Sequence, residues 1–166
     1  ARAWIHQFRF SLPAVSLDVA AAEVLAAAMP PEGAGVRELW GEIAALRSQQ
    51  HLADGDADGT IAAAQRALDA TPPHSFYLRS YAVLYLAFGC QMAGDLPRAH
   101  AVLDAAAAED GIPRELVLLR TIQLRSFVNL AAARPREVAA TVPTMLRLAT
   151  AGSLRTSIIC AHYFLG

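Results

Sequence analysis

The chain has 166 residues, of which 55% are hydrophobic and 7% aromatic, and its formal net charge is −1. This length suits one compact domain or a short run of repeats with a substantial core. All 14 basic residues are arginines, scattered along the chain without the cluster that nucleic-acid binding requires, so we expect no direct contact of this segment with nucleic acid.

The cysteines and the apolar runs indicate a cytoplasmic protein. Cys90 and Cys160 lie far apart in apolar surroundings and outside any CxxC or Cys/His spacing, which predicts buried, reduced thiols. The longest apolar run, Tyr81 to Cys90, is shorter than the roughly 20 residues of a membrane-spanning helix, and no signal peptide is recognisable. Both ends read as helix interiors, so we expect a piece of a longer protein.

Proline and glycine divide the chain into about nine helix-length segments. In chain order the breaks fall at Pro30-Pro31 with Gly33 and Gly35, near Gly55, at Pro72-Pro73, at Gly94-Asp95, at Gly111–Pro113, at Arg134-Pro135 and at Gly152. Apolar residues recur three and four apart within the segments, and no segment alternates apolar and polar residues over a strand length. The sequence therefore predicts an all-α fold.

The breaks recur with a fixed spacing. Gly55-Asp56 and Gly94-Asp95 are 39 residues apart, Ala133-Arg134 lies 39 further on, and one step back from Gly55 gives Ser16. Counted from these markers, small or apolar residues share three offsets: Ala21, Thr60, Ala99 and Val138; Leu25, Ala64, Leu103 and Val142; Ala28, Ala67, Ala106 and Met145. This register predicts that they lie on equivalent helix faces that approach a neighbouring helix closely.

A helix pair that recurs about every 34–47 residues is typical of an α-solenoid. The segments GDADGTIAAAQRALDATPP (55–73) and AGDLPRAHAVLDAAAAED (93–110) resemble the second helix of a tetratricopeptide repeat. We therefore expect one tetratricopeptide-like solenoid domain over residues 1–166, built of antiparallel helix pairs in roughly four repeats plus one extra helix. The chain departs from that family in its longer period, in Arg47 and Ser48 within the first helix from Val36 to Ala53, in Thr60, and in a last repeat without the Gly-Asp turn.

Long alanine- and arginine-rich repeats of this period resemble the MalT-like helical region of large LuxR-type bacterial transcriptional regulators. The closing AHYFLG (161–166) looks like the first helix of another such repeat. The resemblance implies an ATPase module before this region and a helix-turn-helix module after it. Neither is recognised within the 166 residues, which contain no GxxxxGK[ST] loop and no lysine. The resemblance further implies that this segment is not an enzyme, needs no cofactor, and senses an inducer or couples a signal. The alternative is a general tetratricopeptide scaffold that docks a protein partner without a transcriptional role.

The stretch DGDADGTIAAAQ (54–65) raises the question of a metal site. Three acidic residues alternate along it, Asp54, Asp56 and Asp58, and Gly59 follows, as in a calcium-binding EF-hand loop. Gln65 stands where a bidentate glutamate normally closes the loop, and the repeat register needs a helix from Thr60 to Ala70. We interpret the aspartates as helix caps and expect no metal, with weak calcium binding as the alternative.

In tetratricopeptide solenoids the first helix of each pair lines the concave surface, where peptides or small molecules bind. The register assigns these residues to that surface: Phe10, Glu42, Gln49, Tyr81, Phe88, Arg120, Gln123, Phe127. Aromatic rings beside Gln, Glu and Arg can hold a sugar-like or peptide ligand, so the expected partner is a protein or a small-molecule inducer. In the alternative interpretation the aromatics are core and Arg120 and Glu42 form a solvated ion pair.

Three further expectations concern packing, catalysis and assembly. Trp4 and Trp40 are expected to be packing anchors. The five histidines lie on different segments without an HExxH pair, and no GxSxG elbow occurs, so we expect no enzyme. Exposed ends of the helix stack would favour homo-oligomers.

Overall fold

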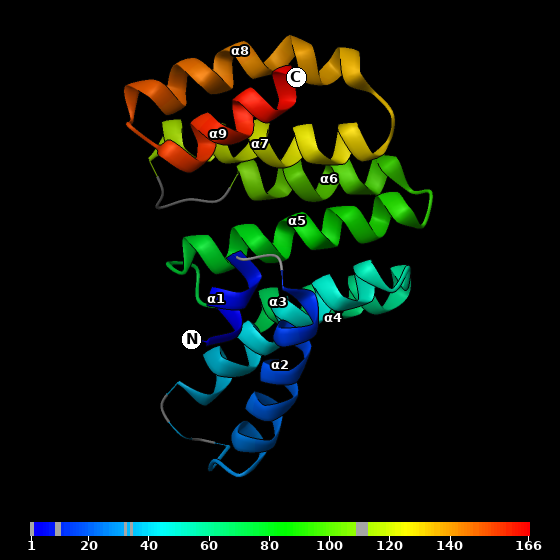
Figure 1. Cartoon of the computed structure of the whole chain (residues 1–166), viewed down its shortest axis with the longest axis vertical. Helices are drawn as coiled ribbons and strands as arrows, with labels where there is room; N and C mark the ends of the chain where they lie inside the picture. The colour runs from blue at the N-terminus through cyan, green and yellow to red at the C-terminus, as the bar shows by residue number, and fades with distance from the viewer. Residues whose placement is uncertain (1, 9–10, 32, 34, 109–112) are drawn as a thin grey trace. The chain divides into compact units, whose positions relative to one another are not determined.

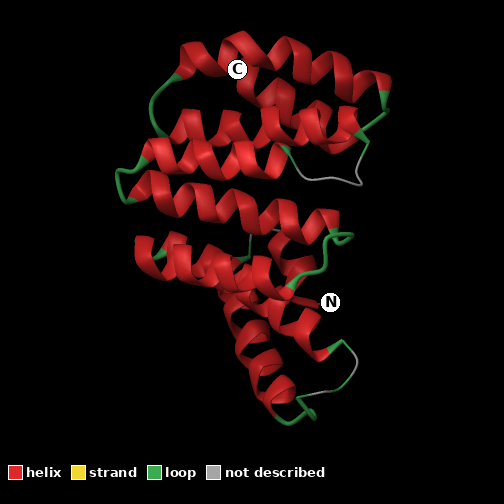
Figure 2. Ribbon diagram, turned by 180° about the vertical axis from the view of Figure 1, so that it is seen from behind, coloured by secondary structure: helices red, strands yellow, loops and turns green. Residues whose placement is uncertain are grey.

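The computed structural model describes residues 2–8, 11–31, 33, 35–108 and 113–166. Within these ranges helix is the only regular secondary structure (Figure 2), which confirms the all-α prediction for this part of the chain. None of the described helices is long and apolar enough to cross a membrane.

The chain forms two compact units, Ala1–Ala93 and Gly94–Gly166. The N-terminal unit contains the helices labelled in Figure 1 as α1 (Arg2–Phe8), α2 (Leu12–Ala27), α3 (Val36–Ala53), α4 (Ala57–Ala70) and α5 (Phe76–Met92). In it α2 packs on α1 and α3, and α5 packs on α3 and α4. The C-terminal unit contains α6 (Leu96–Ala107), α7 (Arg114–Ala131), α8 (Pro135–Ala151) and α9 (Arg155–Leu165). Here α7 packs on α6 and α8, and α9 packs on α8 and α7.

Three turns of the same geometry set the spacing of the later helices. Helices α4, α6 and α8 begin at intervals of 39 residues, as the sequence register predicts. Each is preceded by a residue with left-handed backbone: Gly55 (φ 76°), Gly94 (φ 83°) and Ala133 (φ 56°). Asp56 and Asp95 then cap their helices by accepting a hydrogen bond from the backbone N–H three residues on, at 2.8 and 3.0 Å. The third turn keeps this conformation without glycine or aspartate.

Restoring the Gly-Asp pair at the third turn should stabilise the protein. Ala133 adopts a left-handed conformation that costs an L-residue about 1 kcal/mol, and Arg134 makes no side-chain cap bond to α8, only an exposed ion pair with Glu137 that contributes little. We expect the Ala133→Gly/Arg134→Asp variant to gain about 1 to 2 kcal/mol in free energy of unfolding, measured by urea denaturation.

The matched control is Gly94→Ala at the equivalent turn. No atom lies within 4 Å of a Cβ added to Gly94, so this variant tests the backbone conformation alone. We expect it to lose about 1 kcal/mol. If Gly94→Ala leaves the urea midpoint of unfolding unchanged, the left-handed backbone of this turn does not reduce the stability of a variant with alanine there.

The predicted rows of small residues are buried in three helices. In α4, α6 and α8 every member of the three rows is at most 6% exposed: Thr60, Ala64, Ala67, Ala99, Leu103, Ala106, Val138, Val142, Met145. The register thus identifies the inward faces of these helices correctly, each within its own unit.

For α2 the register is wrong. Ala21, Leu25 and Ala28 are exposed, and Leu25 is 69% exposed. The residues that face inward on α2 lie 45 residues, not 39, before their equivalents in α4 and its C-cap Thr71: Val15, Val19, Ala22, Ala26. The cause is length, since α2 is two residues longer than α4, the loop after it is three residues longer, and α3 is one residue longer than α5.

Two polar residues that depart from the tetratricopeptide pattern satisfy their hydrogen bonds locally. Ser48 Oγ donates to the Ala45 carbonyl at 2.6 Å, and Thr60 Oγ1 donates to the Asp56 carbonyl at 2.7 Å. Because both hydroxyls are paired within their own helix or its cap, their burial carries little penalty.

Helix α5 approaches α4 closely at Gly89. A Cβ at this position would lie 2.8 Å from Ile61 Cγ1 and 3.2 Å from the Ile61 backbone nitrogen. Only the absence of a side chain permits this separation of the two helices.

The two cysteines are free thiols. Cys90 is fully buried, as predicted, whereas Cys160 is only half-buried. Burial still raises the pKa of the Cys160 thiol, which keeps it protonated at neutral pH.

Candidate functional site

A row of aromatic rings runs along one face of α5. Tyr77, Tyr81, Tyr85 and Phe88 recur four, four and three residues apart, and successive ring centroids lie 6.5, 4.7 and 6.2 Å apart. Trp4 from α1 packs edge-on against Tyr77 and Tyr81, at 5.8 and 5.0 Å. We call these five side chains the aromatic row.

Polar side chains of α3 hold the aromatic row in place. The Tyr81 hydroxyl donates to Gln49 Oε1 at 2.8 Å, and Trp4 Nε1 donates to Glu42 Oε2 at 3.0 Å. Burial raises the pKa of the Tyr81 and Tyr85 hydroxyls, so both remain neutral donors over the physiological range.

Four sequence-predicted residues of the N-terminal unit therefore lie along one face: Glu42, Gln49, Tyr81 and Phe88. Gln49 contacts Tyr81 directly, Glu42 reaches it through Trp4, and Phe88 continues the row beyond Tyr85. Tyr77 and Tyr85 were not among the predicted residues, although each lies four residues from Tyr81 on the segment from Phe76 to Met92, a spacing that places all three on one helix face.

The α1 end of this row borders an open pocket of about 720 Å³, which we call the Trp4 pocket. Trp4, Glu38 and Glu42 line it together with residues 74–78, at the start of α5. The Tyr77 side chain is 53% exposed there, and His74 is exposed as well. Three aromatic residues (Trp4, Phe76 and Tyr77) and two carboxylates thus line one solvent-accessible space.

The carboxylates of the Trp4 pocket, Glu38 and Glu42, both accept hydrogen bonds from neutral side chains. Glu42 accepts from Trp4, and Glu38 Oε1 accepts from Ser75 Oγ at 2.9 Å, so both are held by neutral donors. Within the described ranges neither carboxylate forms an ion pair. Negative charge beside the faces of Trp and Tyr rings attracts a cation.

A second open pocket, of about 500 Å³, lies between α2, α3 and α4. Trp40 lines it and is 39% exposed, so it packs only in part, whereas Trp4, the other expected packing anchor, packs against Tyr77 and Tyr81. Arg37 and Arg66 also line the pocket, and Arg37 donates to the Asp69 carbonyl at 2.6 Å. Its lining mixes both signs of charge and favours no single ligand class.

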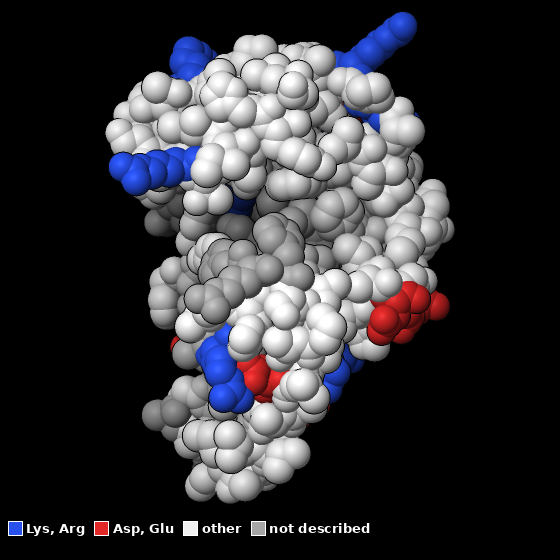
Figure 3. Space-filling model, viewed as in Figure 1, with Lys and Arg blue, Asp and Glu red and all other residues white. Residues whose placement is uncertain are grey.

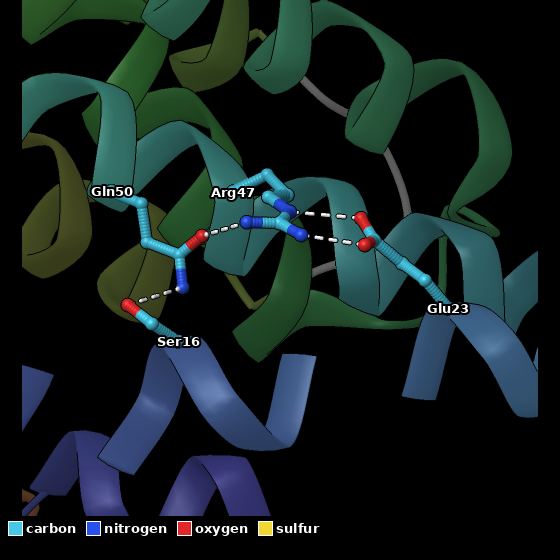
Figure 4. A network of polar contacts seen from close by, with 4 residues as sticks. All are labelled: Ser16, Glu23, Arg47 and Gln50. Carbon is cyan, nitrogen blue, oxygen red and sulfur yellow. Dashed lines mark hydrogen bonds and ion pairs between the residues drawn. The ribbon is translucent and has the colours of Figure 1, made fainter. Parts of the chain in front are cut away.

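Two residues of this second pocket, Glu23 and Arg47, belong to a polar network that joins α2 to α3 (Figure 4). Arg47 binds both carboxylate oxygens of Glu23, at 2.8 and 2.5 Å, and donates to Gln50 Oε1 at 2.7 Å. Gln50 in turn donates to Ser16 Oγ at 3.2 Å. The hydrogen bond to Arg47 lowers the pKa of Glu23 and raises that of Arg47. This network explains why an arginine stands where the tetratricopeptide pattern has an apolar or small residue.

The remaining predicted residues lie in the C-terminal unit and tie α7 to its neighbours. Arg120 is 6% exposed and donates to the Ala106 carbonyl. Gln123 accepts a hydrogen bond from Ser157 Oγ at 3.1 Å, and the Phe127 ring lies 4.8 Å from that of Phe164. Each of these residues has a packing partner within its own unit. Phe10 lies outside the described residues.

The acidic stretch acts as a helix start. Asp56 is the N-cap of α4, and its other oxygen lies 2.8 Å from His51 Nδ1. The Gly59 N–H and, secondarily, His51 lower the pKa of Asp56. Residues 60–62, which an EF-hand loop would hold extended, are helical, and Asp54 and Asp58 are exposed. No group of three or more His, Cys, Asp or Glu residues that could hold a metal ion is found in the part of the chain that the structure describes.

Charge is dispersed over the face of the molecule drawn in Figure 3, where arginines and acidic residues form small separate spots. The Trp4 pocket is therefore distinguished by the combination of charge and exposed rings rather than by charge alone. Comparison of the chain with protein-family models, with curated proteins and with solved structures finds no match.

Proposed function

We propose that this chain is a binding segment of helical-repeat type, and that the Trp4 pocket is its recognition site. One observation carries the proposal: two carboxylates without an ion-pair partner among the described residues share an open pocket with the exposed ring of Tyr77. Neutral hydrogen bonds already orient both carboxylates, so a ligand meets a pre-formed site.

The fold that we propose for the whole chain is a tetratricopeptide-like α-solenoid of about four helix pairs. Its support is the 39-residue interval between α4, α6 and α8 and the shared pattern of buried positions on these helices. The 45-residue first interval is then a longer repeat of the same kind.

The biological role we assign is inducer sensing or signal coupling in a LuxR-type, MalT-like bacterial transcriptional regulator, without catalysis. This assignment comes from the resemblance of the repeats and from a pocket built for recognition. A general tetratricopeptide scaffold with no transcriptional role is the alternative. The sequence of the full gene product distinguishes the two roles: a phosphate-binding loop upstream and a helix-turn-helix downstream would identify the regulator.

The ligand chemistry that fits the pocket is a guanidinium or ammonium group on a peptide. Such a group gains charge-assisted hydrogen bonds from Glu38 and Glu42 and a cation–π contact with Trp4 or Tyr77. Because the pocket is open, contact is expected with one side chain of a partner rather than with a fully enclosed small molecule.

The test is calorimetric titration with the blocked tripeptide acetyl-Gly-Arg-Gly-amide and with its citrulline analogue, which has the same shape and no charge. We expect the arginine peptide to bind at millimolar concentration or below and the citrulline peptide to bind at least about tenfold more weakly, a difference of about 1.4 kcal/mol. Glu42→Gln keeps the acceptor for Trp4 Nε1 and should weaken arginine binding by a similar factor.

Glu137→Gln serves as the control, because Glu137 is an exposed carboxylate of α8 outside the pocket. The affinity of this variant for the arginine peptide should equal that of the unchanged protein. Equal affinity for the arginine and citrulline peptides, or no binding of either, would remove the Trp4 pocket as the recognition site.

A further inference from the structure

The two carboxylates of the Trp4 pocket each keep one oxygen for a ligand. Glu38 and Glu42 are half-buried and lie one turn apart on α3, a spacing that puts their Cβ atoms about 5 to 6 Å apart. Glu38 Oε1 accepts from Ser75 Oγ at 2.9 Å, and Glu42 Oε2 accepts from Trp4 Nε1 at 3.0 Å. The second oxygen of each, Glu38 Oε2 and Glu42 Oε1, accepts no hydrogen bond from the residues that the structure describes.

The two neutral donors hold these carboxylates independently of each other. Trp4 belongs to α1 and packs against the rings of Tyr77 and Tyr81, whereas Ser75 stands at the start of α5. Neither donor can follow its carboxylate across the pocket without disturbing the packing of its own helix. A bound cation therefore has to fit the separation that the two donors set.

Ser75 orients Glu38 at the expense of capping its own helix. It is the N-cap residue of α5, a position where serine usually accepts a hydrogen bond from the first turn, yet its side chain makes no cap bond. The backbone around it is fixed, because the Ser75 N–H donates to the Pro72 carbonyl at 3.1 Å and the Arg79 N–H donates to the Ser75 carbonyl at 3.0 Å. A local preference that is overridden in this way is expected at a functional site.

Ammonium and guanidinium groups differ in how far apart the oxygens that they bind can lie. An ammonium has a single nitrogen, so two carboxylate oxygens bound to it at about 2.8 Å are at most about 5 Å apart. The outer nitrogens of a guanidinium are separated by about 2.3 Å and their N–H bonds diverge, so it bridges oxygens up to about 7 Å apart. Its plane also stacks on an aromatic ring, and the Tyr77 side chain in this pocket is 53% exposed.

We propose that the Trp4 pocket selects arginine over lysine and that Ser75 is the positioning residue that sets this selectivity. The inference rests on the proposed function and deepens it, because it names the side chain that the partner presents. An arginine bridges Glu38 Oε2 and Glu42 Oε1 while both neutral hydrogen bonds remain. A lysine reaches one carboxylate and leaves the other without a partner, unless one of the neutral bonds breaks.

The first test is calorimetric titration of the full chain with three blocked tripeptides. They are acetyl-Gly-Arg-Gly-amide, its lysine analogue and its homoarginine analogue, which carries a guanidinium on the four-carbon stem of lysine. We expect the arginine peptide to bind at least about fivefold more tightly than the lysine peptide. The homoarginine peptide should bind within about twofold of the arginine peptide, which separates the shape of the cation from the length of its stem.

The second test repeats the titrations with variants of Ser75. Ser75→Ala frees Glu38 to move towards an ammonium, so the ratio of arginine to lysine affinity should fall to within about twofold of one. Ser75→Thr keeps the hydroxyl and should restore the ratio. The matched control is Ser80→Ala, since the Ser80 hydroxyl also belongs to α5 but donates to the Phe76 carbonyl at 2.6 Å and does not line the pocket. Circular-dichroism melting curves check that each variant is folded, and a loss of stability alone does not change a ratio of affinities.

Three results overturn the proposal. The first is equal affinity of the unchanged protein for the arginine and lysine peptides. The second is a homoarginine peptide that binds like the lysine peptide, which would assign the selectivity to stem length. The third is a full arginine preference in Ser75→Ala, which would remove Ser75 as the positioning residue. In each case cation binding persists and the proposed function stands, whereas binding of none of the three peptides overturns the proposed function itself.

Discussion

Replacing Met145 by alanine should lower the free energy of unfolding by about 2 to 5 kcal/mol. Met145 is fully buried in α8, in a cluster with Leu119 of α7 and Ala161 of α9. Removing its side chain leaves a cavity where three helices meet, and those helices are too well packed to collapse into it. Urea denaturation followed by circular dichroism measures the loss.

The chain supplies a matched control for this change. Met29→Ala removes the same atoms from a side chain that is 42% exposed and should alter stability by less than about 0.5 kcal/mol. If Met145→Ala does not fold, Met145→Leu conserves volume and should cost less than about 1.5 kcal/mol. Equal effects at Met145 and Met29 would mean that the predicted inward face of α8 is not the buried one.

The second large effect is expected at Gly89, where α5 crosses α4. Gly89→Val should destabilise the protein by about 2 to 3 kcal/mol, because its Cβ would lie 2.8 Å from Ile61 Cγ1 and 3.2 Å from the Ile61 backbone nitrogen. The Ile61 side chain can rotate away, but the backbone of α4 cannot, so the two helices must separate. Stability is again measured by urea denaturation.

The control for Gly89→Val is Ala62→Val, which places the same β-branched side chain on an exposed position of α4. It should cost about 0.5 kcal/mol, the difference in helix propensity alone. Gly89→Ala is informative as well. Alanine stabilises the helix by about 1 kcal/mol relative to glycine, and this gain is offset by the close contact of the added Cβ with Ile61. An unchanged midpoint for Gly89→Val would contradict the close crossing of α4 and α5.

The fold was predictable wherever local chemistry sets the chain geometry. Glycine and proline mark the breaks between helices, and the left-handed turns at Gly55 and Gly94 recur at the interval seen in the sequence. The third turn shows that the fold can impose this conformation on Ala133, which has no local preference for it.

The first interval could not be derived in the same way. Placing Ala21 on the buried face assumed a constant repeat, whereas α2, its loop and α3 together add six residues. Helix and loop lengths depend on where a helix meets its neighbours, and alanine-rich sequence fits several registers equally well. Val15 and Val19, the residues that are buried, carried no signal that distinguished them from exposed Val24.

The candidate site was predicted in part. The repeat register assigns Gln49 and Tyr81 to the same face, and the two side chains are hydrogen-bonded. It did not assign Trp4 or Glu38 to the same pocket, because that depends on how α1 lies against α5, which no periodicity encodes. Arg120 was proposed as a ligand contact or a solvated ion, yet it is buried and bonded to a carbonyl, a role that sequence alone cannot distinguish.

The aromatic row also gives this protein an internal optical probe. Tyr77 and Tyr81 pack against Trp4, close enough for light absorbed by their phenol rings to be re-emitted by the indole. With Trp40 changed to phenylalanine, all indole fluorescence originates at the pocket wall. The ratio of indole emission excited through tyrosine to indole emission excited directly then reports, without an attached dye, whether Trp4 of α1 is in contact with Tyr77 and Tyr81 of α5.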